Sequence, residues 1–107
     1  MNVKTKYYNL LKSGKKIIEL RLFDEKRQKI KTGDEILFSD SSNSNDNFRA
    51  IVINLHRAEN FEKLCETITP EQAGFSSEKE LLSVLEEFYS PTAQKKFGVV
   101  GIEIKKI

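Results

Sequence analysis

The chain has few of the residue types that mark disulfide-linked or metal-bound proteins. Its 107 residues include one cysteine (Cys65), one histidine (His56), two prolines and no tryptophan. A single cysteine excludes an internal disulfide and any zinc site built from several cysteines. Asp34, Asp40 and Asp46 lack the spacing of a calcium-binding loop. We therefore expect no disulfide, no metal site and no cofactor.

Long apolar segments are also missing. The longest apolar runs, such as Ala50–Leu55, are interrupted by polar residues, here Asn54. They fall far short of the roughly 20 residues that cross a bilayer. The first residues contain no apolar region of the kind found in signal peptides. We expect a cytoplasmic protein that does not enter the membrane.

Length and composition favour one small domain. A chain of 107 residues can bury one core and is too short for two. Hydrophobic residues make up 38% and charged residues 32%, so seven phenylalanines and three tyrosines must supply much of the core volume. No internal repeat or linker divides the sequence. We expect a single domain over residues 1–107.

Charge is unevenly distributed along the chain. Residues 57–90 contain eight acidic and three basic side chains, whereas the rest of the chain contains fifteen basic and eight acidic ones. Such a two-sided distribution suits an anionic partner on the basic side. Alternatively, the acidic residues are the solvated faces of two helices. The sequence leaves both interpretations open.

The first half of the chain carries one helix signal and two strand signals. Val3, Tyr7 and Leu10 recur at helical spacing, and Gly14 is a typical helix end. Residues 39–47 are all Ser, Asn or Asp, and we expect them to form a mobile hairpin connection that buries nothing. The expected elements are a helix over 3–13, a strand over 17–22, a loop over 23–31, a turn at 32–34 and a strand over 35–38.

The second half predicts strand, two helices and strand. Two apolar stripes have helical spacing, and a capping box of Ser77 and Glu80 opens the second. Ser90–Pro91 marks its end. The stripes consist of Phe61, Leu64, Cys65 and Ile68, and of Leu81, Val84, Leu85 and Phe88. The expected elements are a strand over 48–55, a helix over 61–68, a second helix that begins after Ser77 and ends at Ser90, and a strand over 98–104. This order predicts an α+β fold, a small mixed sheet or barrel with helices on one side.

The segment Gly14–Arg21 carries a lysine, a glutamate and an arginine where helix gives way to strand. Strand alternation places Glu19 and Arg21 on one face, with Lys16 on the opposite parity. Either Lys16 precedes the regular strand or a bulge re-aims it. These charges suit the floor of a polar pocket. The alternative is an ordinary surface ion pair worth about 0–1 kcal/mol.

Two stretches, Lys12–Arg21 and Ile30–Phe38, closely resemble the signature of the ASCH (activating signal cointegrator homology) domain family. The similarity extends to a helical middle, Phe61–Tyr89, and a closing strand, residues 97–104. It implies a PUA-like fold, a small β-barrel with flanking helices. It also implies an RNA- or nucleotide-binding cleft bordered by the segment that holds Lys16, Glu19 and Arg21.

The resemblance implies an enzymatic alternative as well. Some small family members deacylate acetylated cytidine nucleosides with a lysine, a threonine and a glutamate. The lysine corresponds to Lys16, and Glu19 occupies the threonine position. In the stretch Pro70–Gly74, where the family's glutamate falls, Glu71 is the one carboxylate. Lys16 and Glu19 are thus the candidate catalytic residues of an amidohydrolase, while the departure at Glu19 favours binding.

The same residues have chemistry suited to a nucleotide. A guanidinium such as that of Arg21 pairs bidentately with phosphate, Lys16 adds a second cation, and Glu19 would hold the guanidinium in place. Tyr89, and with it Phe97, offers a surface on which a base can stack. The lysines at 26, 29, 31, 95 and 96 are placed to follow a phosphate backbone.

Three functions remain open from the sequence. The first is an RNA- or nucleotide-binding module whose ligand contacts Lys16, Glu19, Arg21 and Tyr89. The second is the amidohydrolase, and the third is a protein-interaction module built on the acidic segment 57–90. His56 and Cys65 are weaker candidates, because no carboxylate is placed by sequence to orient the imidazole and the thiol lies on an apolar helix stripe.

Overall fold

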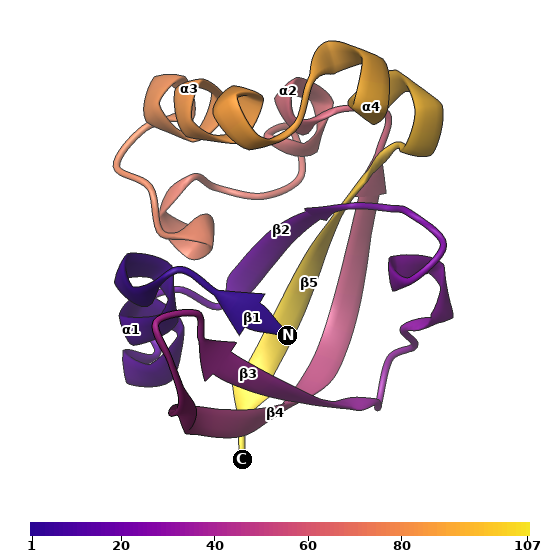
Figure 1. Ribbon diagram of the computed structural model, residues 1–107. Coiled ribbons are helices and arrows are strands. Elements are labelled where there is room, and N and C mark those ends of the chain that lie inside the picture. Colours follow the sequence, from indigo (N-terminus) through magenta and orange to yellow (C-terminus); the bar gives the residue numbers. More distant parts are fainter.

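One curled sheet of five strands organises the fold (Figure 1). The computed structural model describes residues 1–107. The strands are β1 (Asn2–Val3), β2 (Ile18–Leu22), β3 (Glu35–Asp40), β4 (Asn43–Ala58) and β5 (Val99–Lys106), in the spatial order β1-β3-β4-β5-β2. β1 pairs with β3 in parallel, and the other neighbours are antiparallel. The sheet is therefore a partial barrel whose open side lies between its edge strands, β1 and β2.

Helices cover the sheet at two places (Figure 1). Helix α1 (Thr5–Ser13) lies beside the lower part of the sheet, and three helices form a layer above it. These are α2 (Phe61–Leu64), α3 (Glu78–Phe88) and α4 (Pro91–Phe97). Two 3₁₀ turns, η1 (Arg27–Lys29) and η2 (Glu71–Ala73), lie in the connections. None of the helices combines the length and the apolar character needed to cross a bilayer.

Two hydrophobic clusters meet at the sheet. One packs α1 against β3, β4 and β5 around Tyr8, Phe38 and Ile102. The other packs α2 and α3 against β2, where Ile18 and Leu20 are buried. Because Ile18 and Leu20 face the helix layer, the alternating residues of β2 point to the opposite side of the strand. The expected α+β small barrel with flanking helices is confirmed, and its packing places the charged face of β2 at the open side.

Two elements were not expected from the sequence. Ser90 and Pro91 end α3, but they also begin α4, because the Ser90 hydroxyl accepts a hydrogen bond from the Ala93 amide at 3.1 Å and Pro91 occupies the first turn. Strand β1 has two residues, too few for a periodic signal. The expected helix over 61–68 is shorter than predicted, since α2 ends at Leu64.

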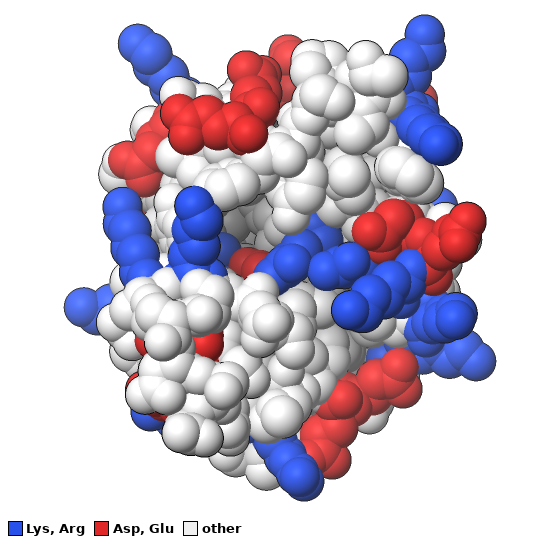
Figure 2. All heavy atoms as spheres, viewed as in Figure 1, with Lys and Arg blue, Asp and Glu red and all other residues white.

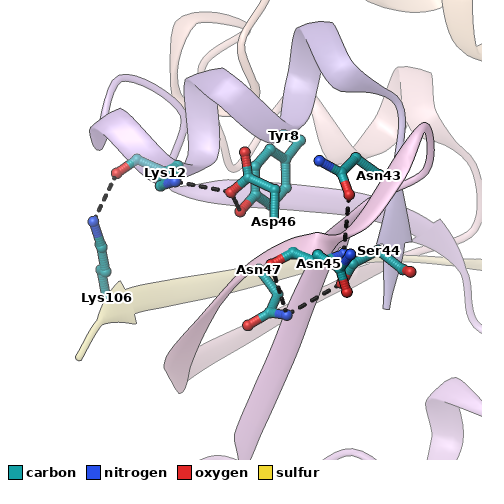
Figure 3. A network of polar contacts seen from close by, with 8 residues as sticks. All are labelled: Tyr8, Lys12, Asn43, Ser44, Asn45, Asp46, Asn47 and Lys106. Carbon is teal, nitrogen blue, oxygen red and sulfur yellow. Dashed lines mark hydrogen bonds and ion pairs between the residues drawn. The ribbon is translucent and has the colours of Figure 1, made fainter.

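The polar hairpin between β3 and β4 is wrongly predicted as a connection that buries nothing (Figure 3). Both strands extend into it, and Asp40 is buried, with its carboxylate accepting from the Thr5 hydroxyl at 2.6 Å. The carboxylate of Asp46 accepts from the Tyr8 hydroxyl at 2.7 Å and from Lys12 at 2.8 Å. The donors come from α1, so the hairpin is held by a distant element that local composition does not reveal.

Tyr8 should be the last of the three tyrosines to ionise. Burial, followed by the hydrogen bond to Asp46, raises the pKa of Tyr8 to about 12. The ordinary pKa of a tyrosine is about 10. The contribution of the Tyr8 hydroxyl to folding stability is therefore complete below pH about 10 and is lost as the pH rises toward 12. An ultraviolet titration should show a late step that Tyr8→Phe removes. A late step that persists in Tyr8→Phe would contradict the assignment.

Candidate ligand-binding site

Three charged side chains form a buried network on β2 and the residues before it. The Lys16 ammonium lies 3.0 Å from Glu19 Oε1, and Arg21 Nη2 lies 2.9 Å from Glu19 Oε2. Arg21 Nε also donates to Oε2 at 3.0 Å. Lys16 is 3% and Glu19 5% exposed. The network is therefore not the exposed ion pair that the sequence left as an alternative.

Lys16 reaches the network because it precedes the strand. β2 begins at Ile18 and pairs with β5 without a break in register, so no bulge is involved. The Lys16 amide donates to the carbonyl of Leu10 at 3.0 Å, which fixes the chain after α1. Gly74 has φ of +88°, and a Cβ there would lie 3.0 Å from Lys16 Cδ. Glycine thus permits both the turn and the passage of the lysine stem.

The two cations keep Glu19 ionised. Burial alone would raise the pKa of the Glu19 carboxyl, but the charges of Lys16 and Arg21 and their hydrogen bonds outweigh it and hold the pKa below its ordinary value. Two cations and one carboxylate leave the network with an excess of one positive charge. The arrangement attracts a group that is anionic or rich in hydrogen-bond acceptors.

A cavity of about 180 Å³ opens onto this network. It lies at the open side of the sheet, between β1 and the start of α1 on one side and α3 on the other, and Lys16, Glu19 and Arg21 all line it. Figure 2 shows a hollow near the middle of this face, with acidic and basic atoms at its bottom. Arg21 also spans the open side, because its Nη2 donates to the Asn2 carbonyl at 2.8 Å.

Aromatic rings form much of the cavity wall. These rings belong to Tyr7, Phe75, Phe88 and Tyr89. The Lys16 ammonium lies 5.0 Å from the centroid of Tyr7 and 5.7 Å from that of Phe75. At the mouth, Phe88 is 46% exposed. The cavity therefore combines a charged floor with flat apolar walls.

Comparison with known proteins decides the family. A model of the ASCH domain family matches residues 1–107. The chain belongs to the ASCH domain family. The crystal structure of hypothetical protein PH0355 is similar at 37% sequence identity and a TM-score of 0.87, covering 100% of this chain and 96% of that one. The solution NMR structure of protein PF0455 from Pyrococcus furiosus is similar at 34% identity and a TM-score of 0.77, covering 100% and 94%. No curated protein matches the sequence.

The PUA-like fold expected from the resemblance is thus confirmed, and this ASCH domain brings four predicted site residues together. Lys16, Glu19, Arg21 and Tyr89 line one cavity, although Tyr89 comes from the end of α3, far along the chain. Burial is the main cause of a raised pKa of Tyr89. The fifth candidate, Phe97, does not join them. It lines a separate open depression of about 940 Å³ between α2, α3 and α4.

The larger depression has less of the character of a site. Its charged lining residues are exposed, and they carry both signs. Gln94 is its buried polar side chain, and both ends of the amide are already bonded, to the Phe61 amide at 3.2 Å and to the Tyr89 carbonyl at 3.1 Å. Lys95 and Lys96 lie there, whereas Lys26 and Lys29 lie at η1. A protein-binding role for the acidic segment 57–90 stays a prediction.

Several wall residues of the ASCH cavity were not predicted. Phe88 and Val84 belong to the apolar stripe of α3, which the sequence assigns to the core, yet both line the cavity. Tyr7 belongs to the helical pattern of the first predicted helix, and Phe75 lies between the two later predicted helices. Helical spacing identifies an apolar face, but it does not say whether a protein core or an open cavity meets that face.

The remaining candidates lie elsewhere in the ASCH domain. Glu71 is exposed and does not line the cavity. His56 has a carboxylate partner that the sequence did not indicate, because its Nε2 lies 2.7 Å from Glu103 Oε1 on the neighbouring strand β5. Burial, then the charges of Glu78 and Glu62, raise the pKa of the Cys65 thiol, which makes it a poor nucleophile.

Proposed function

We propose that this ASCH domain binds RNA by taking one unpaired base into the cavity, with a free nucleotide as the smallest ligand. The observation that carries the proposal is the buried network of Lys16, Glu19 and Arg21 beneath aromatic walls. Proteins that read single-stranded RNA stack unpaired bases on aromatic side chains and bond their edges to polar groups. The cavity offers both kinds of contact.

The size of the cavity supports one base rather than a larger ligand. Its volume of about 180 Å³ is smaller than the roughly 300–1,000 Å³ of pockets for drug-sized ligands. One flat group can enter, and the sugar and phosphates then remain at the mouth. The rest of an RNA strand would lie on the surface outside.

The floor suits the edge of a base. Lys16 and Arg21 provide donors, and Glu19 Oε1 has a second lone pair beyond its bond to Lys16. Bases present donors and acceptors side by side, so a floor with both types can hold such an edge. The excess positive charge favours the nearby phosphate.

Fewer observations favour deacylation of an acetylated cytidine. No serine, threonine or cysteine lines the cavity, so a covalent acyl transfer has no aliphatic hydroxyl or thiol nucleophile there. The hydroxyls present belong to Tyr7 and Tyr89, and burial raises the pKa of both, which disfavours the nucleophilic phenolate. Glu71 lies outside the cavity. We expect purified protein to leave acetylated cytidine intact, and deacetylation that Lys16→Ala abolishes would favour the amidohydrolase instead.

The proposal is tested by binding of short, fluorescently labelled single-stranded RNAs of mixed sequence. Fluorescence anisotropy should show binding at low salt that weakens as salt is added. A duplex of the same sequence should bind more weakly, because its bases are not free to enter the cavity. Wild-type protein that binds neither these RNAs nor nucleosides at low salt would contradict the proposal.

Phe88→Ala separates stacking from folding. Phe88 lines the mouth and is 46% exposed, so its loss should weaken RNA binding by about 1–3 kcal/mol and change stability little. Leu37→Ala is a matched control, because Leu37 is also 46% exposed but does not line the cavity. Anisotropy measures binding, and thermal unfolding monitors the fold. Equal affinities for the two variants would remove Phe88 from the site.

A further inference from the structure

The free edge of β2 borders the cavity. Three successive residues of this strand, Glu19, Leu20 and Arg21, line the cavity, whereas no residue of β5, the one strand that pairs with β2, lines it. Side chains alternate between the two faces of a strand, so a space that is bordered by three residues in a row lies at the edge of the strand. The cavity therefore meets the backbone of β2 as well as its charged side chains.

The hydrogen-bond register of β2 directs the peptide groups of Leu20 away from β5. The Ile104 amide donates to the Ile17 carbonyl at 2.9 Å, and the Phe23 amide donates to the Gly98 carbonyl at 3.0 Å. The two strands are antiparallel and pair without a break in register between these bonds. Odd positions of β2 therefore bond to β5, and even positions present their N–H and C=O groups to the free edge. Leu20 occupies an even position.

Leu20 thus carries one donor and one acceptor that the protein does not pair. No second strand lies beside β2, and no backbone group outside the sheet bonds to the Leu20 N–H or C=O. The nearby side-chain bonds from Arg21 run to Glu19 and to the Asn2 carbonyl instead. Leu20 is only 4% exposed, and buried backbone groups are nearly always paired. A ligand in the cavity is placed to supply the missing partners.

We propose that the peptide groups of Leu20 bind the Watson–Crick edge of the base in the cavity. The Leu20 C=O accepts from a ring N–H or amino group of the base, and the Leu20 N–H donates to the adjacent ring nitrogen or carbonyl oxygen. This inference rests on the proposed function and adds how the base is selected. All four bases carry such an adjacent donor and acceptor, so the site accepts any base whose Watson–Crick edge is unpaired and unmodified.

The test compares three oligouridylates with wild-type protein in the anisotropy assay, so it does not depend on the folding of a variant. In 3-methyluridine a methyl group replaces the N3 hydrogen, the one donor on the Watson–Crick edge of uracil. In 5-methyluridine a methyl group of the same size lies away from that edge, which makes it the matched control. Oligomers of 3-methyluridine should bind about tenfold or more weakly than those of uridine, because the buried Leu20 C=O then stays unpaired. Oligomers of 5-methyluridine should bind like those of uridine.

Amide NMR locates the contact and separates this inference from the proposed function. Uridine should shift the Leu20 amide proton downfield, as a new hydrogen bond does. The amide of Leu22, which points to the same edge but does not line the cavity, should move little. If 3-methyluridine oligomers bind like those of 5-methyluridine while Phe88→Ala still weakens RNA binding, the contact with Leu20 is wrong and the base site stands. If wild-type protein binds neither RNA nor nucleosides, both are wrong.

Discussion

Glu19→Gln is expected to lower the free energy of unfolding by about 3–5 kcal/mol. Glu19 is 5% exposed and is the shared partner of Lys16 and Arg21. The amide keeps the shape of the side chain but removes the charge, which leaves two cations near each other without a counterion. Buried charges without a partner are among the most destabilising changes known in proteins. Urea unfolding at neutral pH measures the effect.

Glu35→Gln provides the control on the same sheet. Glu35 pairs with Arg49 at 3.5 Å, and both side chains are more than half exposed. Exposed pairs of this kind contribute about 0–1 kcal/mol. If Glu19→Gln lowers the free energy of unfolding no more than Glu35→Gln does, the network does not hold the fold together. Its charges are then free to rearrange in the absence of a ligand.

The same substitution has a defined pH dependence. The pKa of Glu19 is lower in the fold than its ordinary value of 4.5, so the unfolded chain takes up the proton first. The contribution of Glu19 is therefore complete above pH about 4.5 and is lost as the pH falls through the folded-state pKa. The stability difference between wild type and Glu19→Gln should narrow in acid. A difference that stays constant from neutral to acid pH would contradict the assignment.

Local sequence was enough to place the floor of the cavity. Alternation along β2 put Glu19 and Arg21 on one face, and the position of Lys16 just before the strand was one of two readings that the sequence allowed. That Glu19 is buried did not follow from the sequence. Its surroundings come from segments far apart in the chain, α1, α3 and β1, whose Asn2 carbonyl accepts from Arg21, and a strand of two residues such as β1 has no sequence signature.

The walls could not be predicted for a related reason. Tyr7, Phe75 and Phe88 come from α1, the segment after η2, and α3. Tyr7 and Phe88 belong to apolar patterns that are typical of core residues, and Phe75 lies between two predicted helices. Only the packing of the three segments leaves a space between them. The polar hairpin shows the converse case, because Asp40 and Asp46 find their donors on α1. Composition describes a segment, whereas burial depends on its partners.

Replacing all three charges by apolar residues should have an effect opposite to that of Glu19→Gln on stability. The triple variant Lys16→Met, Glu19→Leu, Arg21→Met is expected to be as stable as wild type or more stable, by up to about 4 kcal/mol, and to lose RNA binding. Buried ion networks lose much of their attraction to the cost of desolvation, and apolar residues of similar volume often replace them without loss. The aromatic walls, with Val84 and Leu85, already give the new side chains apolar neighbours.

The loss of one hydrogen bond limits the gain in stability. Arg21→Met removes the donor to the Asn2 carbonyl, an exposed contact worth about 0.5–1.5 kcal/mol, so the triple variant could fall short of the upper figure. Urea unfolding and RNA anisotropy on the same preparation measure both properties. A triple variant as unstable as Glu19→Gln would mean that the charges serve the fold, and one that still binds RNA would remove them from the site. A triple variant that is as stable as wild type but no longer binds RNA would show that the charges are maintained for a ligand, since the fold is then no weaker without them.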